Sequence, residues 1–335
     1  MSVYDYPVHP VSPEESSAPE TTSPCPVCQG TSALPRYRLK GLRFRLVECE
    51  GCGTGSLYPL PDVAEIPDFY PQDYYGETGT KFVPPVEAMI RFISRRQARK
   101  MATGLKSGDK VLDVGCGRGV LLKSFLELGL ESHGMEISPM AVEGADERIQ
   151  LRFAPTLKEA GYEAEFFDQI VIWHVLEHLL YPRETIQEAS RLLKPGGRLV
   201  VSVPNYSSLQ SRWAREAWFH LDLPRHLFHF PVAGLRQLLE ENGFQCEQEH
   251  HFSLRMNPFG WVQSWLNRNQ NLPRNTLYTL LQTRGGAEKE QLSTGTKLKQ
   301  KLAYYLGMPV ALLVSFYAAM RSSGASVTII ARKKS

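Results

Sequence analysis

A glycine-rich loop and the acidic residue that follows it are the residues best suited to chemistry in this chain. Apolar residues 111–114 predict a buried parallel strand that leads directly into Gly115, Gly117 and Gly119, after which a helical pattern begins. Glycine lets the backbone approach a ligand closely because it has no Cβ. Glu136 ends the next predicted strand, where a carboxylate can hydrogen-bond both hydroxyls of a ribose. Together these residues predict a nucleoside site.

The same loop argues against two other classes of nucleotide-binding protein. A dinucleotide fingerprint needs glycine at position 120, where this chain has valine, and a P-loop needs Lys followed by Ser or Thr. The loop therefore has nothing to hold a triphosphate. A nucleoside that carries little phosphate fits better, and S-adenosylmethionine is the obvious candidate.

Four of the six cysteines form two Cys-x2-Cys pairs with twenty residues between them, Cys25 with Cys28 and Cys49 with Cys52. This spacing is typical of a tetrahedral zinc site made of four thiolates. Two disulfides are the alternative, although the first residues do not resemble a secretion signal and we therefore expect a reducing compartment. Because four protein ligands leave the metal no open position, we expect the Zn²⁺ to be structural.

Taken in order, these and later motifs resemble the class I S-adenosylmethionine-dependent methyltransferases. The resemblance rests on residues 111–119, on Glu136, on the segment 167–178, and on the Leu-Leu-Lys-Pro-Gly-Gly turn at 192–197 with the strand that follows it at 198–205. Each motif alone is moderate evidence, but their order and spacing together are specific to the family.

The resemblance covers roughly residues 85–255 and the terminal strand near 325–333. It implies an α/β fold with a doubly wound, seven-stranded, mostly parallel sheet of the Rossmann-like methyltransferase kind. In such a sheet, ligands bind beyond the carboxyl ends of the strands. The residues expected to bind the cofactor S-adenosylmethionine are Asp113, Gly115, Cys116, Gly117, Gly119, Glu136, Ile137, Phe153, Ala154, Trp173 and His174.

Strand and helix patterns alternate through this region, which predicts a parallel sheet with right-handed crossovers. Phe153 or the loop 154–157 should border the adenine. Related enzymes often have an acidic residue in that loop, but here backbone groups or Thr156 would have to hold the exocyclic amine. The strands are expected at 110–114, 132–137, 149–153, 168–173, 198–203, 244–252 and 326–332.

Methyl transfer to a hydroxyl or an amine requires a base, and histidine titrates near neutral pH. His174 follows the fourth core strand, and His226 and His229 lie in the segment that borders the acceptor in related sequences. These three histidines are the candidate catalytic residues, while any one of them could instead cap a helix or orient a loop. Glu177 and His178 are expected to open the next helix, and Glu177 is interpreted as mainly structural.

The domain organisation follows from composition. Residues 1–24 have no Lys, no Arg and no apolar run, which predicts a disordered tail. We expect a zinc knuckle at 25–58 as a small N-terminal appendage. A linker or lid should follow at 59–85, with Tyr70, Tyr74 and Tyr75 available to close the cofactor pocket. Residues 86–335 are expected to form the methyltransferase domain.

An insertion at 253–325, expected to be helical and apolar, precedes the last strand. The chain from Ser253 onward carries twelve Lys and Arg against two acids, so the net charge of +3 hides a basic end on a mildly acidic body. The apolar run 302–320 could just span a bilayer, but both flanks belong to one sheet, so full spanning is not expected. Gly307 and Pro309 are predicted to break it into a hairpin. A buried helix or dimer interface and an anionic membrane surface both remain as interpretations.

Three functions are consistent with the sequence. The first is a base-assisted methyltransferase that acts on a small-molecule, sugar or lipid-linked hydroxyl, in the cytoplasm or peripherally at the inner face of the membrane. The second is a methyltransferase of ribosomal or transfer RNA that uses the zinc knuckle to hold nucleic acid, although the knuckle has few aromatic residues for base stacking. The third is a non-catalytic module that binds the cofactor and a partner. The acceptor and the oligomeric state are not fixed by the sequence.

Overall fold

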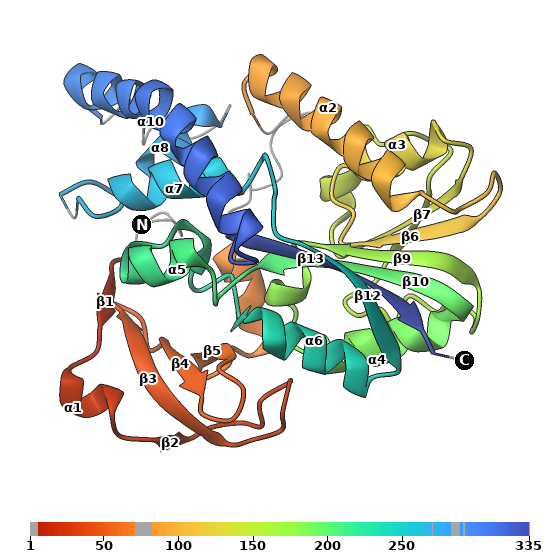
Figure 1. Cartoon of the computed structure of the whole chain (residues 1–335), viewed down its shortest axis with the longest axis horizontal. Helices are drawn as coiled ribbons and strands as arrows, with labels where there is room; N and C mark the ends of the chain where they lie inside the picture. The colour runs from red at the N-terminus through yellow and green to blue at the C-terminus, as the bar shows by residue number, and fades with distance from the viewer. Residues whose placement is uncertain (1–5, 71–81, 270, 283–288, 291, 335) are drawn as a thin grey trace.

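Two β-sheets organise the chain, one near each end of the molecule as Figure 1 presents it. The computed structural model describes residues 6–70, 82–269, 271–282, 289–290 and 292–334. The larger sheet carries the glycine-rich loop, and the smaller one carries the four paired cysteines. A layer of helices from the C-terminal third lies above the junction of the two sheets in Figure 1.

The larger sheet has seven strands in the order β12-β13-β10-β9-β6-β7-β8. β13 is antiparallel to both of its neighbours, and the remaining core pairs are parallel. The predicted seven-stranded, mostly parallel sheet is therefore confirmed. Its strands are β6 (Lys110–Val114), β7 (Glu131–Glu136), β8 (Gln150–Phe153), β9 (Phe167–Trp173), β10 (Leu193–Pro204), β12 (Phe244–His250) and β13 (Ser326–Lys333).

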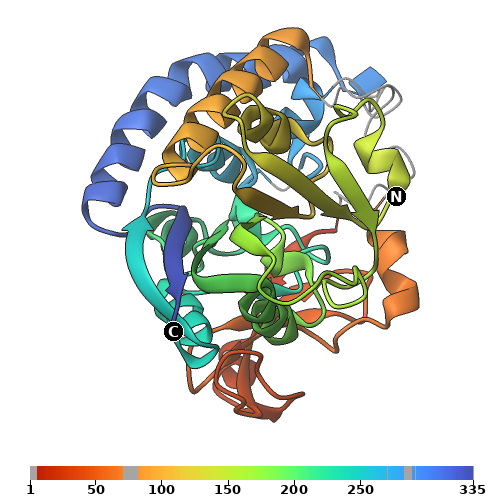
Figure 2. The same ribbon diagram turned by 90° about the vertical axis from the view of Figure 1, so that its right-hand side faces the viewer.

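Helices cover both faces of this sheet, as the edge-on view in Figure 2 shows. Val111 and Val200 pack into a cluster with residues of α2 and α3, whereas their neighbours Leu112 and Leu199 pack with residues of α4 and α6. Successive side chains of a strand point to opposite faces, so a strand buried on both sides must be apolar throughout. These helices are α2 (Pro84–Met101), α3 (Val120–Leu126), α4 (Pro182–Leu192) and α6 (Val232–Glu241).

Short elements connect the core or flank it. They are η1 (Val63–Phe69), η2 (Pro139–Val142), η3 (Leu176–His178), α5 (Leu209–Ala214), η4 (Arg215–Ala217) and η5 (Phe219–Leu221). The predicted linker 59–85 is described up to residue 70 and again from residue 82, so Tyr74 and Tyr75 lie outside the described residues.

The smaller sheet is antiparallel and is larger than the predicted zinc knuckle. It pairs β1-β3-β4-β5-β11, and β2 joins β3 from the side. One of its strands, β11, comes from the segment 86–335, so the N-terminal appendage is hydrogen-bonded to the rest of the chain. Its elements are β1 (Val8–Pro10), α1 (Pro13–Ser16), β2 (Glu20–Thr21), β3 (Ser32–Leu39), β4 (Arg45–Cys49), β5 (Gly55–Tyr58) and β11 (Phe228–His229).

The prediction of a disordered tail at 1–24 is wrong for the described residues 6–24. β1 pairs with β3, and the side chain of Val8 is buried. Ser12 and Glu15 form a capping box that starts α1. The composition of this segment predicted disorder, but its acidic residues, including Glu20, form ion pairs with arginines of β3 and β4 further along the chain.

The insertion before β13 is helical, as expected, and consists of α7 (Asn257–Leu266), α8 (Thr276–Leu281) and α10 (Thr294–Met320). Contrary to prediction, Gly307 and Pro309 do not break α10, which is one continuous helix of 27 residues. Gly307 lies against Val262 of α7, where a Cβ would come within 3.1 Å of the valine Cγ2, so glycine allows close packing of the two helices. Pro309 lies on the exposed side, where water can replace the hydrogen bond that proline cannot make.

Candidate functional site

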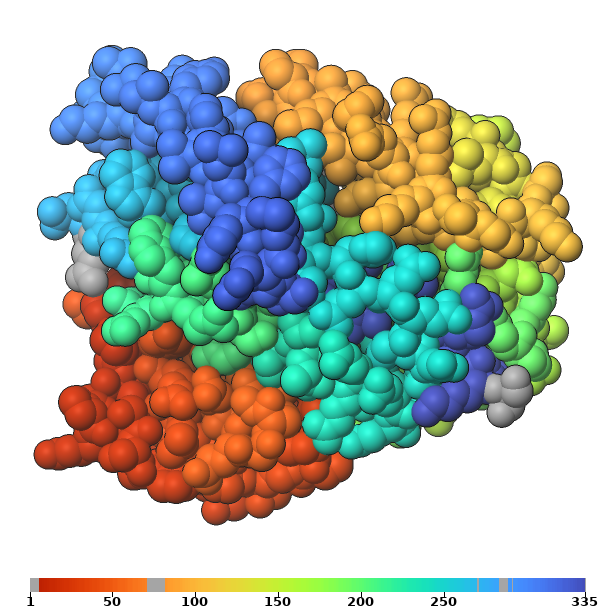
Figure 3. All heavy atoms as spheres, in the orientation of Figure 1, coloured from red at the N-terminus to blue at the C-terminus, as the bar shows by residue number. Residues whose placement is uncertain are grey.

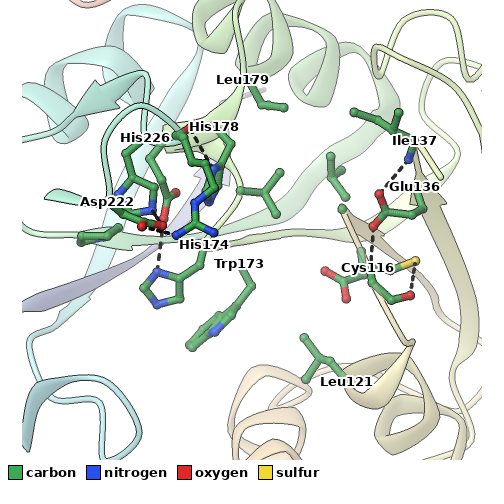
Figure 4. A pocket seen from close by; sticks show the side chains of 18 of the residues that line it. Cys116, Leu121, Glu136, Ile137, Trp173, His174, His178, Leu179, Asp222 and His226 are labelled. Atoms are coloured by element: carbon green, nitrogen blue, oxygen red, sulfur yellow. Dashed lines mark hydrogen bonds and ion pairs between the residues drawn. The ribbon is translucent and has the colours of Figure 1, made fainter. Parts of the chain in front are cut away.

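A large cavity opens beyond the carboxyl ends of β6, β7 and β9. Its volume is about 1740 Å³ among the described residues, which exceeds the roughly 300–1,000 Å³ of a typical pocket for one small ligand. Figure 4 shows two groups of polar side chains on opposite sides of it, Glu136 with Cys116 on one side and the histidines with Asp222 on the other. The size and this division indicate a site for two ligands.

The glycine-rich loop forms the first side of the cavity. Gly115 has φ +70°, and a Cβ there would lie 2.6 Å from Val175 Cγ2, so no other residue fits. Gly117 has φ +50°, and a Cβ there would meet no atom of the described chain within 4 Å, so its backbone borders open space. The N–H groups of Gly115 and Cys116 both donate to the carbonyl of Met135, at 2.8 and 3.1 Å, which fixes the loop against β7.

Glu136 stands at the tip of β7, where the sequence predicted it. Its side chain is buried, with Oε2 accepting from the Gly117 N–H at 2.9 Å and Oε1 accepting from the Ile137 N–H at 2.8 Å. These two bonds orient the carboxylate toward the cavity that it lines. Each oxygen keeps a further acceptor site, so the geometry fits a pair of ribose hydroxyls.

Asp113 lies beneath the loop, with its side chain almost fully buried. Burial raises the pKa of its carboxyl to about 8, and the nearby charge of Glu136 adds to the effect. The carboxyl that a cofactor would meet is therefore that of Glu136, because Asp113 is held largely in its neutral form at neutral pH.

The structure brings most of the predicted cofactor residues to this cavity, but not all of them. Gly119, Phe153 and Ala154 are not among the residues that line it, and 48% of the Phe153 surface is exposed to solvent. Residues 155–158, in the loop that follows β8, line the cavity instead. The predicted residues that line the cavity are Asp113, Gly115, Cys116, Gly117, Glu136, Ile137, Trp173 and His174.

His174 follows β9 and lies on the same side of the cavity as His226 and Asp222 (Figure 4). Its φ of +54° is a conformation that residues other than glycine rarely adopt, and such strain concentrates at functional sites. Its Nδ1 lies 3.4 Å from Glu177 Oε1, and its Nε2 lies 3.4 Å from Ser326 Oγ.

Glu177, which the sequence analysis interpreted as mainly structural, lies in the short helix η3. Its side chain lines the cavity with only 1% exposure, and neither carboxylate oxygen has a hydrogen-bond partner within the part of the chain that is described. Its close polar neighbour is His174 Nδ1, 3.4 Å from Oε1. A buried carboxylate without a hydrogen bond is costly, so its presence at the cavity wall points to a ligand or to function. The signal in the sequence was only its position three residues after His174.

His226 has a tautomer that the surrounding structure fixes. Its Nδ1 lies 2.9 Å from the carbonyl oxygen of His220, and because a carbonyl can only accept, Nδ1 must carry the proton. Burial, reinforced by nearby positive groups, lowers the pKa of His226 well below its usual value, so the ring is neutral at pH 7. Its Nε2 is then unprotonated and able to accept a proton. The ring lines the cavity.

Asp222 is positioned to help His226 accept a proton. Its Oδ2 lies 3.7 Å from His226 Nε2, and its other oxygen pairs with Arg225. Burial opposes ionisation of this carboxyl, but Arg225 outweighs the burial and keeps the pKa of Asp222 below its usual value. A negative charge beside Nε2 would stabilise the imidazolium that forms when His226 takes up a proton.

His229, the third candidate base, does not reach the cavity. Its ring is buried in β11, and its Nε2 donates to the carbonyl of Leu221 at 2.9 Å. Burial lowers its pKa to about 4. This histidine orients the segment that carries His226, which is the structural alternative that the sequence left open.

A cluster of polar groups surrounds His226 on this side. His178 packs edge-on against it with ring centroids 4.6 Å apart, and its Nδ1 lies 3.1 Å from both the Arg225 carbonyl and the Tyr70 hydroxyl. Tyr70, predicted as part of the lid, thus lines the cavity. Ligand atoms of Glu177, His178 and His226 lie within 4.8 Å of one another, a spacing that could also hold a metal ion.

The rest of this second side is apolar and aromatic. Phe219 contacts Phe259 and Tyr278 with ring centroids 5.2 and 5.6 Å apart, and Phe82 packs edge-on against Tyr278. The inner side of α10 adds further apolar surface through Tyr304. The sequence reasoning missed these residues because they come from separate segments that only the tertiary structure brings together.

The four paired cysteines meet as the sequence predicted. Cys25 Sγ and Cys52 Sγ lie 3.5 Å apart, Cys28 Sγ and Cys49 Sγ lie 3.4 Å apart, and all four sulfurs are within 4.8 Å of one another. None of them forms a disulfide. Four thiolates around one point at such distances suit tetrahedral Zn–S bonds of about 2.3 Å. A Cβ on Gly51 would lie only 3.2 Å from Cys28 Sγ, so glycine keeps this cradle open.

Comparison with known proteins identifies the class. Residues 86–249 match the family model of a methyltransferase domain. Together with the seven-stranded sheet, this match shows that the chain carries a methyltransferase domain.

Curated relatives include ubiquinone biosynthesis O-methyltransferases. The mitochondrial protein of Schizosaccharomyces pombe is 35% identical over 104 residues, which is 29% of this chain and 38% of that protein. A protein of the same name from Xanthomonas oryzae pv. oryzae is 34% identical over 106 residues, covering 30% of this chain and 44% of its own length. The chain thus matches less than half the length of these relatives.

Solved structures of S-adenosylmethionine-dependent methyltransferases are also similar to the chain. One from Archaeoglobus fulgidus has a TM-score of 0.46 and 20% identity, covering 72% of this chain and 94% of that one. Another from Mesorhizobium loti has a TM-score of 0.42 and 16% identity, covering 72% and 98%. Neither similarity bears on the acceptor.

Proposed function

We propose that the protein transfers a methyl group from S-adenosylmethionine to a hydroxyl of a small, largely apolar acceptor of the lipid-linked kind. The observation that carries this proposal is the arrangement of His226, whose unprotonated Nε2 borders an apolar, aromatic half of the cavity opposite Glu136. The names of the curated relatives, which are O-methyltransferases, agree with a hydroxyl acceptor. In this proposal the protein works in the cytoplasm, at the inner face of a membrane.

The bound donor would supply an electrophilic methyl carbon on a sulfonium, whose leaving group departs without charge. Glu136 would hold the ribose, and the loop at Gly117 would leave room for the donor's backbone contacts. Methyl transfer to the acceptor oxygen would release the hydroxyl proton, and His226 Nε2 would accept it. Asp222 then stabilises the imidazolium.

The aromatic wall explains why such an acceptor is favoured. Phe219, Phe259 and Tyr278 present apolar surface next to the histidine cluster, where a sugar alone would leave its hydroxyls unpaired. Burial of an aromatic or alkyl group there would also exclude water from the reacting oxygen.

The four cysteines bind Zn²⁺ in this proposal. All four sulfurs are used as ligands, so the ion would hold the small sheet together and take no part in methyl transfer. The chemistry of the donor set supports zinc over the harder divalent cations, because thiolates are soft ligands.

The experiment that tests the function supplies labelled S-adenosylmethionine with phenols that carry alkyl tails of increasing length. We expect O-methyl ethers to form and kcat/KM to rise with tail length. A second assay offers the RNA of the host cell. Label that appears in RNA and not in the phenols would overturn the proposal, and so would an absence of transfer to any hydroxyl compound.

Glu136 provides a direct test of the donor site. We expect Glu136→Ala to raise the Kd for S-adenosylmethionine about 100-fold. The variant loses two hydrogen bonds from the ribose to a charged carboxylate, each worth about 1.5–3 kcal/mol, and water replaces them in part. Calorimetric titration measures this. Glu131→Gln, at the opposite end of the same strand, is the matched control and should leave the Kd unchanged. An unchanged Kd in Glu136→Ala would remove Glu136 from the donor site.

A further inference from the structure

Helix α10 has an unusual distribution of apolar residues, because its large hydrophobic side chains face away from the protein. They recur three or four positions apart and so form one stripe along the helix. Exposed fractions reach 71% at Leu313 and 77% at Met320. The members of this exposed stripe are Leu298, Leu302, Tyr305, Leu306, Val310, Leu313, Phe316, Tyr317 and Met320.

The opposite face of α10 packs against α7 and α8. Tyr304 and Met308 are partly buried there beside Ala311, while the fully buried side chains of α10 are small or polar. Gln300, Ala311, Ser315 and Ala318 are all buried, and Ser315 Oγ donates back to the Ala311 carbonyl at 2.6 Å. A surface helix of a protein surrounded only by water directs its main apolar stripe toward the core. In α10 the larger set of apolar side chains is the exposed one, although Tyr304 and Met308 pack inward. Figure 3 shows α10 crossing the face of the molecule that is turned toward the viewer. An exposed apolar stripe of this length is the mark of an interaction surface.

Charges near the stripe indicate what covers it. Residues 294–320 contain no acidic side chain, while Lys297, Lys299 and Lys301 lie in the first turns of α10 and Arg321 directly follows its end. Helix α2, which lies on the same side of the molecule in Figures 1 and 2, adds the exposed side chain of Phe92. Apolar side chains bordered by cations match the interface of an anionic bilayer, in which the chains enter the acyl region and the cations meet phosphates. The exposed cations of α2 are Arg91, Arg95, Arg96, Arg99 and Lys100.

We propose that α10 lies in the plane of an anionic membrane with its exposed stripe inserted. A spanning orientation does not fit, because β12 and β13 flank the insertion and pair with each other in the same sheet. By length and composition alone, α10 could cross a membrane. The pairing of β12 with β13 therefore decides against the spanning orientation. Contact in the plane of the membrane keeps α10 packed on α7.

This proposal rests on the proposed function and makes it more specific. Tyr304 and Met308, on the inner side of α10, line the same cavity as Met89 of α2, which is 40% exposed. The two helices whose outer faces meet the bilayer therefore both supply walls of the acceptor half. A lipid-linked acceptor could enter the cavity from the membrane without crossing water.

Flotation with vesicles tests the docking surface independently of methyl transfer. The full-length protein is mixed with vesicles of phosphatidylcholine, with or without phosphatidylglycerol. We expect it to float with the anionic vesicles, and the double variant Leu306→Glu, Leu313→Glu to float at least about tenfold less, because two charges would have to enter the acyl region. Both leucines are exposed, so the fold should survive, which Tm and the Kd for S-adenosylmethionine will verify.

The matched control is Gln245→Glu, Gln248→Glu, which adds the same charge at exposed positions of β12 and should float like the wild type. Equal flotation of the stripe variant and the wild type would overturn the proposal. Failure of the wild-type protein to float would also overturn it. If the wild type and the control are dimers in solution and the stripe variant is a monomer, the stripe is the interface with a second copy of the chain. Flotation without methylation of any phenol would leave the docking intact and refute the proposed function instead.

Discussion

The His226→Asn variant should lose about 10²–10⁴-fold in kcat, the usual contribution of a positioned general base. Asparagine is the informative replacement because its Nδ2 can stand where Nδ1 donates to the His220 carbonyl. The variant therefore keeps the hydrogen bond that holds the segment and loses only the basic Nε2. Methylation of an alkyl phenol, measured at saturating S-adenosylmethionine, gives the result.

The pH profile separates a base from a merely structural residue. Burial holds the pKa of His226 well below 6.5, so the wild-type kcat should be level around neutral pH and fall only as the pH drops through that lowered value. In His226→Asn this acid limb should disappear. A variant that retains more than a tenth of wild-type kcat, with the acid limb intact, would exclude His226 as the base, and His174→Asn would be the next variant to examine.

The fold was largely predictable from the sequence because its signals are local. The central strands β6, β9 and β10 contain apolar runs that are followed by a glycine or polar residue, as at Val114 and Gly115. All seven strands lie within a few residues of the predicted ranges, the largest difference being the earlier start of β10 at Leu193. Strand β1 escaped prediction because it is stabilised by pairing with β3, which no local pattern records.

In the candidate site, too, the parts with local sequence signals could be predicted and the parts formed by distant segments could not. Gly117 and Glu136 contact each other through a loop and a strand tip whose motifs are short and specific, so the donor half could be predicted. The aromatic half of the cavity, which we propose takes the acceptor, contains Phe82, Phe219 and Tyr278. These residues lie far apart in the chain and carry no spacing signal. Phe153 was misplaced because the sequence shows where a strand ends but not how the following loop turns.

The cysteine-bearing sheet and the acceptor half are physically connected, which the sequence could not indicate. β5 pairs with β11, and the Leu57 N–H donates to the Leu227 carbonyl at 2.8 Å. The Leu227 N–H in turn donates to the carbonyl of Glu177 at 2.8 Å. Leu227 directly follows His226, so the small sheet holds the histidine segment from one side while η3 holds it from the other.

A second contact strengthens this connection. Arg183 of α4 donates from Nε to the Pro26 carbonyl at 2.8 Å, and its guanidinium also bonds the Val27 carbonyl and Glu241. Pro26 and Val27 lie between the first two cysteines. The cysteine cluster is thereby fixed to the helix that follows η3, and its order bears on the position of His226.

Loss of zinc should therefore abolish methyl transfer while sparing donor binding. Cys49→Ser removes one thiolate of the buried cluster. Structural Zn²⁺ contributes an apparent free energy of about 10–16 kcal/mol in small zinc folds, as large as the whole stability of about 5–15 kcal/mol of a typical domain. We expect the small sheet to unfold and β11 to lose its partner, so kcat should fall at least 100-fold while the Kd for S-adenosylmethionine changes little, because Glu136 and Gly117 lie on the other side of the cavity.

Zinc content by elemental analysis, thermal unfolding, donor titration and methylation of an alkyl phenol measure the four expected effects. Cys246→Ser is the matched control, because Cys246 is an isolated, half-buried cysteine of β12. It should keep one zinc per chain and full activity. If Cys49→Ser retains both its zinc and its kcat, the four cysteines are not a structural metal site. If it loses zinc but keeps kcat, the small sheet does not position His226, and the hydrogen bonds through Leu227 are then insufficient to couple the two regions.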